Sequence, residues 1–92
     1  MLVMINVAFT DNIQRHVECP PCAVDGSSVR EVLDAVFRSN SKARSYVLDD
    51  AGAVRKHMTV FVNGAQIKDR ISLSDPVPDG ASVYIMQALS GG

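Results

Sequence analysis

The chain has 92 residues, enough for one small domain built around a single hydrophobic core. Its net charge of −1 argues against nucleic-acid binding, which requires clustered cations opposite phosphates. Apolar residues make up 47% of the chain and tryptophan is absent, so we expect an aliphatic core. The opening MLVMI is far too short for a membrane span and lacks the basic segment of a signal peptide. We therefore expect a soluble, cytoplasmic protein without a membrane partner.

The first predicted elements are two strands. Residues 2–9, LVMINVAF, form an apolar run interrupted only by Asn6, which predicts a strand in the interior of a sheet. Residues 10–14, TDNIQ, break this strand. Residues 15–19, RHVEC, then predict a short second strand ahead of the turn-rich PPCAVDG.

The next segment, GSSVREVLDAVFRSN, predicts the main helix. Ser28 followed by Glu31 is a capping box, in which the hydroxyl accepts from a free amide while the carboxylate reaches back. Asn40 is the predicted stop, because asparagine tolerates the left-handed conformation that ends helices. Apolar residues recur at helical spacing and predict one buried stripe, formed by Val29, Val32, Leu33, Val36 and Phe37.

The middle of the chain is less regular. We expect a short helical turn from Ala43 to Leu48, with Tyr46 and Leu48 facing inward, followed by a turn at DDAG. Basic residues are enriched here and nearby. A solvated face is the ordinary explanation for such a bias, and a docking surface for an acidic partner is the alternative. The residues concerned are Arg38, Lys42, Arg44, Arg55 and Lys56.

The last third predicts three strands. HMTVFVNGAQI indicates a strand, a tight turn at Asn63-Gly64 and a short returning strand. After the turn-rich SDPVPDGA, SVYIMQAL predicts a final strand with Val83 and Ile85 on one face, and Tyr84 and Met86 on the other. These strands and the packed helix together predict a two-layer α+β domain.

The C-terminal half resembles the small sulfur-carrier proteins of the MoaD/ThiS type, which have the ubiquitin-like β-grasp fold. Asp79, Gly80 and Val83 match the turn that leads into the family's last strand, and Gly91-Gly92 matches its terminus. The resemblance implies one β-grasp domain over residues 1–92. In that fold a mixed sheet of four to five strands carries one main helix on one face, and residues 88–92 form a flexible C-terminal tail.

The resemblance also implies a chemical role for the tail. An ATP-dependent, ubiquitin-activating-like adenylyltransferase would adenylate the carboxylate of Gly92, and a sulfur donor would then displace AMP to leave a thiocarboxylate. Gly91 lacks Cβ and could thread a narrow channel, while Ser90 and Leu89 would be recognised at its mouth. A downstream sulfur-accepting enzyme would consume the sulfur in a molybdopterin, thiazole, cysteine or secondary-metabolite pathway.

In this role the chain is a carrier, or the small subunit of a synthase complex. It would have no catalytic side chain of its own, no permanent cofactor and no metal. Partners of the family grip a partly apolar sheet surface near the tail, which makes Tyr84, Met86 and Ala88 the candidate partner-binding residues. Alternatively, Tyr84 and Met86 cover an edge of the core. Two other functions stay open: a modifier conjugated through Gly92 to lysines, and a β-grasp binding module with an idle tail.

The sequence Cys19-Pro-Pro-Cys22 lies outside the family's pattern. The predicted helix begins near Ser28, six residues after Cys22, so no helix N-terminus lowers the pKa of these thiols. A zinc site needs four ligands, and the spacing of His16 and His57 fits no standard motif. Neither histidine has a partnered nucleophile. Three alternatives remain for Cys19 and Cys22: an incidental pair, a reversible redox pair and, third, a metal site.

Overall fold

The structure is a computed structural model that describes residues 4–87. The expectations for residues 2 and 3 of the first strand and for residues 88–92 lie outside this range. Within it the helices are α1 (Asp11–Gln14), α2 (Val29–Arg38) and α3 (Ser41–Val47). The strands are β1 (Ile5–Phe9), β2 (Cys22–Val24), β3 (Met58–Val62), β4 (Ala65–Gln66) and β5 (Ser82–Gln87).

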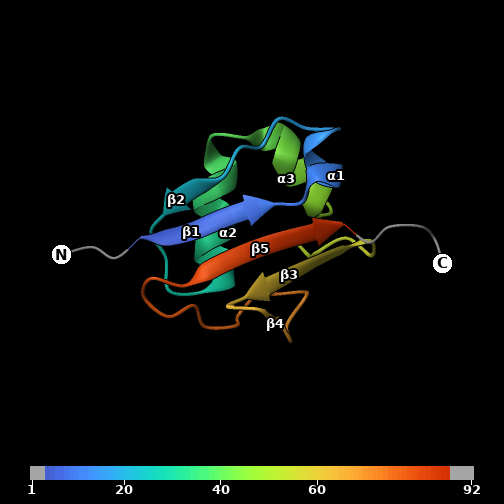
Figure 1. Ribbon diagram of the computed structural model, residues 1–92. Coiled ribbons are helices and arrows are strands. Elements are labelled where there is room, and N and C mark those ends of the chain that lie inside the picture. Colours follow the sequence, from blue (N-terminus) through green and yellow to red (C-terminus); the bar gives the residue numbers. More distant parts are fainter. Residues whose placement is uncertain (1–3, 88–92) are drawn as a thin grey trace.

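The described strands form one mixed sheet in the order β2-β1-β5-β3-β4, with α2 crossing behind it (Figure 1). The two ends of the chain supply the neighbouring strands β1 and β5, which run parallel and pair Phe9 with Ile85. On its other side β5 runs antiparallel to β3, where Val60 faces Ile85. The predicted α+β class, with a main helix on one face of the sheet, is confirmed.

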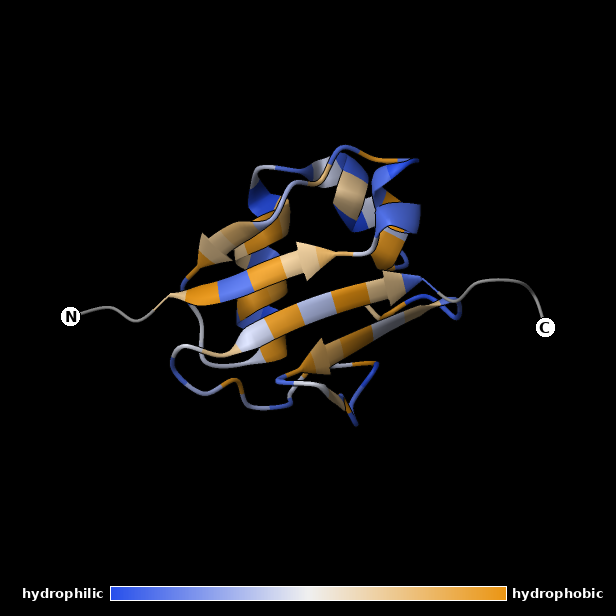
Figure 2. Cartoon of the chain, in the orientation of Figure 1, coloured by the Kyte–Doolittle hydropathy of each residue, from blue (hydrophilic) through white to orange (hydrophobic). Residues whose placement is uncertain are grey.

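The first strand is interior, as predicted, but β5 and not β1 is the middle strand. Ile5, Val7 and Phe9 are buried while Asn6 is exposed, so β1 buries one face and not two. The near-continuous apolar run of β1 arises because Ala8, between buried Val7 and Phe9, is apolar although it is partly exposed. Figure 2 shows the resulting alternation of more and less hydrophobic bands along β1 and β5.

Helix α2 forms where the periodicity predicts it, and every residue of its predicted apolar stripe is buried. Burying a valine, leucine or phenylalanine side chain contributes about 1.5–3 kcal/mol each, so this stripe is a main source of stability. The Ser28 hydroxyl accepts from the amide of Glu31 over 3.2 Å, as expected. The Glu31 carboxylate, however, accepts from the amide of Ser27 at 2.8 Å, one residue earlier than the predicted capping box requires.

The predicted strand over residues 15–19 is wrong. Residues 11–14 form the single turn of α1, which buries Ile13 completely, and the amide of Val17 still bonds to the Ile13 carbonyl. The chain needs the following residues to return to the edge of β1. The second strand therefore starts only at Cys22, and Val24 pairs with Ile5.

Asn40 does not end α2 through a left-handed conformation. Its φ is −149°, and the cap of α2 is Ser39. Asn40 instead caps α3, since its side-chain oxygen accepts from the amide of Ala43 over 3.2 Å. Because a second helix begins immediately, the chain does not make the reversal that a left-handed residue would give. The predicted helical turn at 43–48 is confirmed as α3, with Leu48 buried just after its end.

The hairpin prediction is also confirmed. Asn63 and Gly64 have φ values of 50° and 84°, the paired positive angles that the tight turn between β3 and β4 requires. On β5, Val83 and Ile85 are buried while Tyr84 and Met86 are 40% and 38% exposed, so the two predicted faces are confirmed. Among the described residues, no helix is long and apolar enough to cross a membrane.

Candidate functional site at the end of the middle strand

The predicted tail begins at one end of the sheet, directly after the middle strand β5. Gln87 is the last residue of β5 and pairs with Met58 of β3. The carbonyl of Ile85 accepts from the amide of Thr10 over 3.0 Å, so the end of β5 is bonded on both sides. The predicted site residues that follow, Ala88, Leu89, Ser90, Gly91 and Gly92, lie outside the described part of the chain. Their roles stay predictions.

The face of the sheet away from α2 carries the two described residues of the predicted partner surface. Tyr84 lies between Ala8 of β1 and Phe61 of β3 in the strand register, and Thr59 lies opposite Met86. We call these five side chains the open face. Ala8, Thr59 and Phe61 were not predicted from the sequence as part of this surface. The alternation of β3 around buried Met58 and Val60 was the signal for two of them.

A shallow hollow of about 320 Å³ adjoins Tyr84 on this face. Asn6 and Ala8 of β1, Pro21, and Ser82 of β5 contribute to its lining. The open face thus presents exposed aromatic and thioether side chains next to a shallow hollow. Aromatic residues and methionine are enriched at protein interfaces.

Tyr46 connects α3 to the end of β5. Its hydroxyl donates a hydrogen bond to Oε1 of Gln87 over 3.0 Å. Its ring stacks on that of His16, with 5.6 Å between centroids and 28° between planes. The predicted inward orientation of Tyr46 is therefore observed in part: the half-buried side chain packs on the core and also reaches the strand end.

A second hollow, of about 310 Å³, lies beside Gln87. We call it the strand-end notch. It is lined by Ser45, Tyr46, Arg55, His57, Met58 and Gln87, and no carboxylate is among these residues. The Nε of Arg55 donates to the carbonyl of Ser45 over 2.8 Å, which fixes the guanidinium at the rim of the notch.

Comparisons with known proteins identify the fold. No protein-family model matches the sequence, and no curated protein matches it. The crystal structure of SAMP1 from Haloferax volcanii is 21% identical and superposes with a TM-score of 0.80, over 97% of this chain and 99% of that one. The BexX/CysO complex of Amycolatopsis orientalis gives 20% identity and 0.78, over 96% and 99%. Urm1 from Trypanosoma brucei gives 20% and 0.68, over 97% and 95%.

The chain has the ubiquitin-like β-grasp fold. The fold implied by the resemblance to MoaD/ThiS-type carriers is therefore confirmed along almost the whole chain. In this β-grasp domain the contact between Tyr46 and Gln87 and the strand-end notch lie at the end of the sheet where β5 finishes. Of the open face, Met86 and Thr59 lie next to this end, while Tyr84 lies further back along β5.

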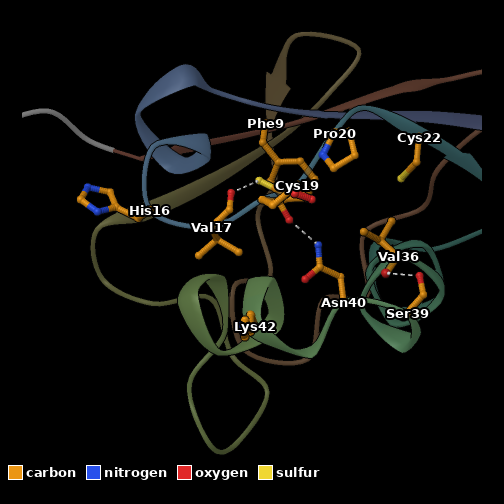
Figure 3. Close-up of a pocket in the computed structure, with 11 residues that line it drawn as sticks. Phe9, His16, Val17, Cys19, Pro20, Cys22, Val36, Ser39, Asn40 and Lys42 are labelled. Atoms are coloured by element: carbon orange, nitrogen blue, oxygen red, sulfur yellow. Dashed lines mark hydrogen bonds between the residues drawn. The ribbon is translucent and has the colours of Figure 1, made fainter.

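The two cysteines of the β-grasp domain line a separate hollow of about 580 Å³ (Figure 3). Cys19 is 2% exposed and its thiol donates to the carbonyl of Val17 over 3.3 Å, whereas Cys22 is exposed on β2. Desolvation raises the pKa of both thiols above the ordinary value. In Figure 3 the two sulfur atoms stand on different sides of Pro20, and both cysteines are free.

This geometry does not provide an activated thiolate, because nothing lowers the pKa of either group. A redox role for Cys19 and Cys22 stays a prediction. His16 also lines this hollow, but within the described residues no group of three or more His, Cys, Asp or Glu side chains could hold a metal ion. His57 lies apart, in the strand-end notch.

Proposed function

We propose that the chain is a ubiquitin-like sulfur carrier whose reacting group is the carboxylate of Gly92. The observation that carries this proposal is the fold, which agrees with SAMP1 over 97% of this chain and 99% of that one. Further support comes from Gly91-Gly92, which lies shortly after the middle strand and matches the family's terminal motif. The carrier itself supplies no catalytic side chain in this proposal.

The chemistry explains why such a carrier needs an activating enzyme. A carboxylate oxygen is a poor leaving group, so the Gly92 carboxylate first attacks the α-phosphate of ATP, forming an acyl-adenylate and releasing pyrophosphate. A sulfide equivalent from the donor then attacks the carbonyl carbon. A carbon–sulfur bond forms as the bond to AMP breaks, and the thiocarboxylate can pass its sulfur to an acceptor enzyme. ATP is thus a substrate of the adenylyltransferase and not a cofactor of the carrier.

The described structure supports this role by holding the base of the tail. Residue Gln87 is fixed through its backbone pairing with Met58 and through the Tyr46 hydroxyl. An enzyme that grips the domain would therefore meet Gln87, from which the tail continues, at a defined position. Defined placement of a reacting group is a large part of the advantage of an enzyme-bound over a free reactant.

We propose that the open face is the surface through which the adenylyltransferase and the sulfur-accepting enzyme bind. Tyr84 and Met86 are the central described contacts, and Ala88 would extend the same surface. CysO of A. orientalis, which shares the fold, was solved in complex with BexX. That complex supports a binding role for a domain of this shape.

A second candidate is protein modification. One of the similar solved structures is the small archaeal modifier protein 1 of H. volcanii. In this alternative the adenylated Gly92 carboxylate is transferred to a lysine amine and forms an isopeptide bond. Both functions use the same activation step and differ in the final acceptor.

The decisive experiment is an intact-mass measurement of the full chain after co-expression with the ubiquitin-activating-like adenylyltransferases of its source organism. We expect a species in which one terminal oxygen is replaced by sulfur, and its absence from a variant lacking Gly92. No mass change with any of these enzymes would overturn the carrier proposal. Higher-mass covalent adducts in lysates that vanish on deletion of Gly92 would instead establish modification.

A further inference from the structure

The segment Arg55-Lys56-His57 lies next to the end of the middle strand. It immediately precedes β3, whose first residue, Met58, pairs with Gln87. All three side chains are exposed. The sequence shows only a mild basic bias spread over the middle of the chain, whereas the fold brings this part of it to the base of the predicted tail.

The cationic groups at this end are not neutralised within the described residues. The one ion pair among residues 4–87 joins Arg30 to Asp34 on α2, so neither Arg55 nor Lys56 is paired with a carboxylate in that part of the chain. In the nearest acidic turn of the sequence, the Asp49 carboxylate accepts hydrogen bonds from the amides of Ala51 and Ala53. The strand-end notch therefore has one cationic group, the Arg55 guanidinium, on its wall and no carboxylate in its lining, and Lys56 lies next to Arg55 in the sequence.

The side chain of Arg55 is oriented by one hydrogen bond, which leaves part of its guanidinium free. Its Nε donates to the Ser45 carbonyl, and its own carbonyl accepts from Nη2 of Arg70, both over 2.8 Å. Its terminal nitrogens have no hydrogen bond to any described residue. An oriented guanidinium binds a carboxylate through two parallel hydrogen bonds, and it loses less side-chain entropy than a freely rotating one.

We propose that the strand-end notch receives an acidic side chain, aspartate or glutamate, of the adenylyltransferase that activates Gly92. The carboxylate would pair with Arg55, with Lys56 and His57 beside it. This inference rests on the proposed function and adds to it an electrostatic contact separate from the apolar open face. Such a contact next to Gln87 steers the encounter and fixes the orientation of the base of the tail.

Two other basic residues of the middle section, Arg38 and Lys42, line hollows other than the strand-end notch. Arg38 lines a hollow with Met4, where β1 begins, at the opposite end of the sheet from Gln87. Lys42 lines the cysteine hollow. Arg38 is therefore a matched control for Arg55, since both are exposed arginines that differ in their position relative to the end of β5.

The test is ATP–pyrophosphate exchange by the adenylyltransferase of the source organism, measured as a function of carrier concentration. We expect Arg55→Glu to raise the KM for the carrier about tenfold with kcat little changed, because a contact at the edge of an interface acts on association. Arg38→Glu should leave KM unchanged. Added salt should raise the KM of the natural chain and lower that of Arg55→Glu, because screening weakens the attraction in the first case and the repulsion between two carboxylates in the second.

Lys56→Glu provides a second variant, since its side chain makes no hydrogen bond to a described residue and its loss should not disturb the fold. Equal KM values for the natural chain, Arg55→Glu and Lys56→Glu would overturn the proposed contact at the strand-end notch and leave the proposed function standing. A lower KM for Arg55→Glu would show that the notch holds the chain's own terminal carboxylate, which also overturns the proposal. No exchange with the natural chain would overturn the proposed function, and the notch with it.

Discussion

The hydroxyl of Tyr46 in α3 donates a hydrogen bond to Oε1 of Gln87, the last described residue of β5, over 3.0 Å. The two residues lie 41 positions apart in the sequence. Their contact joins the helical layer to the end of the middle strand, and the His16 ring stacks on Tyr46 beside it. The base of the predicted tail is therefore supported from outside the sheet as well as within it.

Replacing Tyr46 by phenylalanine tests this support. Tyr46→Phe keeps the ring that stacks on His16 and removes only the hydroxyl, so we expect a loss of about 0.5–1.5 kcal/mol in the free energy of unfolding. The amide of Gln87 should also exchange its hydrogen faster, because the strand end opens more often. Urea unfolding and hydrogen exchange measure the two effects. Tyr84→Phe is the control, and a loss of equal size there would contradict a specific role for Tyr46.

The open face predicts a separation of binding from stability. Tyr84→Ala and Met86→Ala should each weaken binding of the adenylyltransferase by about 1–2 kcal/mol, as expected for central interface side chains. The free energy of unfolding should change less, since both side chains are already substantially exposed in the folded chain. Calorimetric titration and urea unfolding give the two numbers. Ile71→Ala is the matched control, because Ile71 is 74% exposed on a loop outside the sheet. Equal effects of all three variants on binding would contradict the open face as the interface.

The loop over residues 69–75 predicts a loss of stability in acid. The Asp69 carboxylate accepts from the hydroxyl of Ser74 and from the amides of Ser72, Ser74 and Ile71, and these bonds lower its pKa to about 2. A carboxyl with a depressed folded-state pKa stabilises the fold above its unfolded pKa. Its contribution is lost as the pH falls, between about pH 4 in the unfolded chain and about pH 2 in the folded one.

This loop matters because it completes the start of α2. The carbonyls of Leu73 and Asp75 accept from the amides of Arg30 and Val29, over 2.9 and 3.0 Å. Asp69→Asn should therefore be less stable at neutral pH and should lose less stability on acidification than the natural chain. Urea midpoints at neutral pH and near pH 3 measure this, with exposed Asp50→Asn as the control. An unchanged acid dependence in Asp69→Asn would contradict the assignment.

The two thiols should differ in reactivity. In the folded chain, iodoacetamide should label exposed Cys22 and leave Cys19 protected until unfolding. Because desolvation raises the pKa of Cys22, its thiolate is scarce at neutral pH and the labelling rate should climb as the pH increases. Mass spectrometry of the labelled protein reports both effects. A fast, pH-independent reaction at Cys22 would favour the redox interpretation, in which Cys22→Ser abolishes function with the tail intact.

The sequence alone determined the parts of this protein that depend on neighbours along the chain. The α2 stripe follows from helical periodicity, the hairpin from Asn63-Gly64, and the two faces of β5 from strict alternation. The resemblance carried by Asp79, Gly80 and Gly91-Gly92 added the fold and the proposed chemistry. For the candidate site, Tyr84 and Met86 were placed correctly because the side chains of a strand alternate whatever its partners.

Tertiary structure decided what depends on residues far apart in the sequence. The single turn of α1 buries Ile13, and the second strand begins only at Cys22. No local sequence pattern predicts this start, because it depends on long-range pairing with the edge of β1. The same kind of pairing places Phe61 beside Tyr84, and brings Tyr46 and Arg55 to Gln87. Strand register and helix packing are set by the burial of a shared core, so the surroundings of the strand end emerged only when the whole chain was folded.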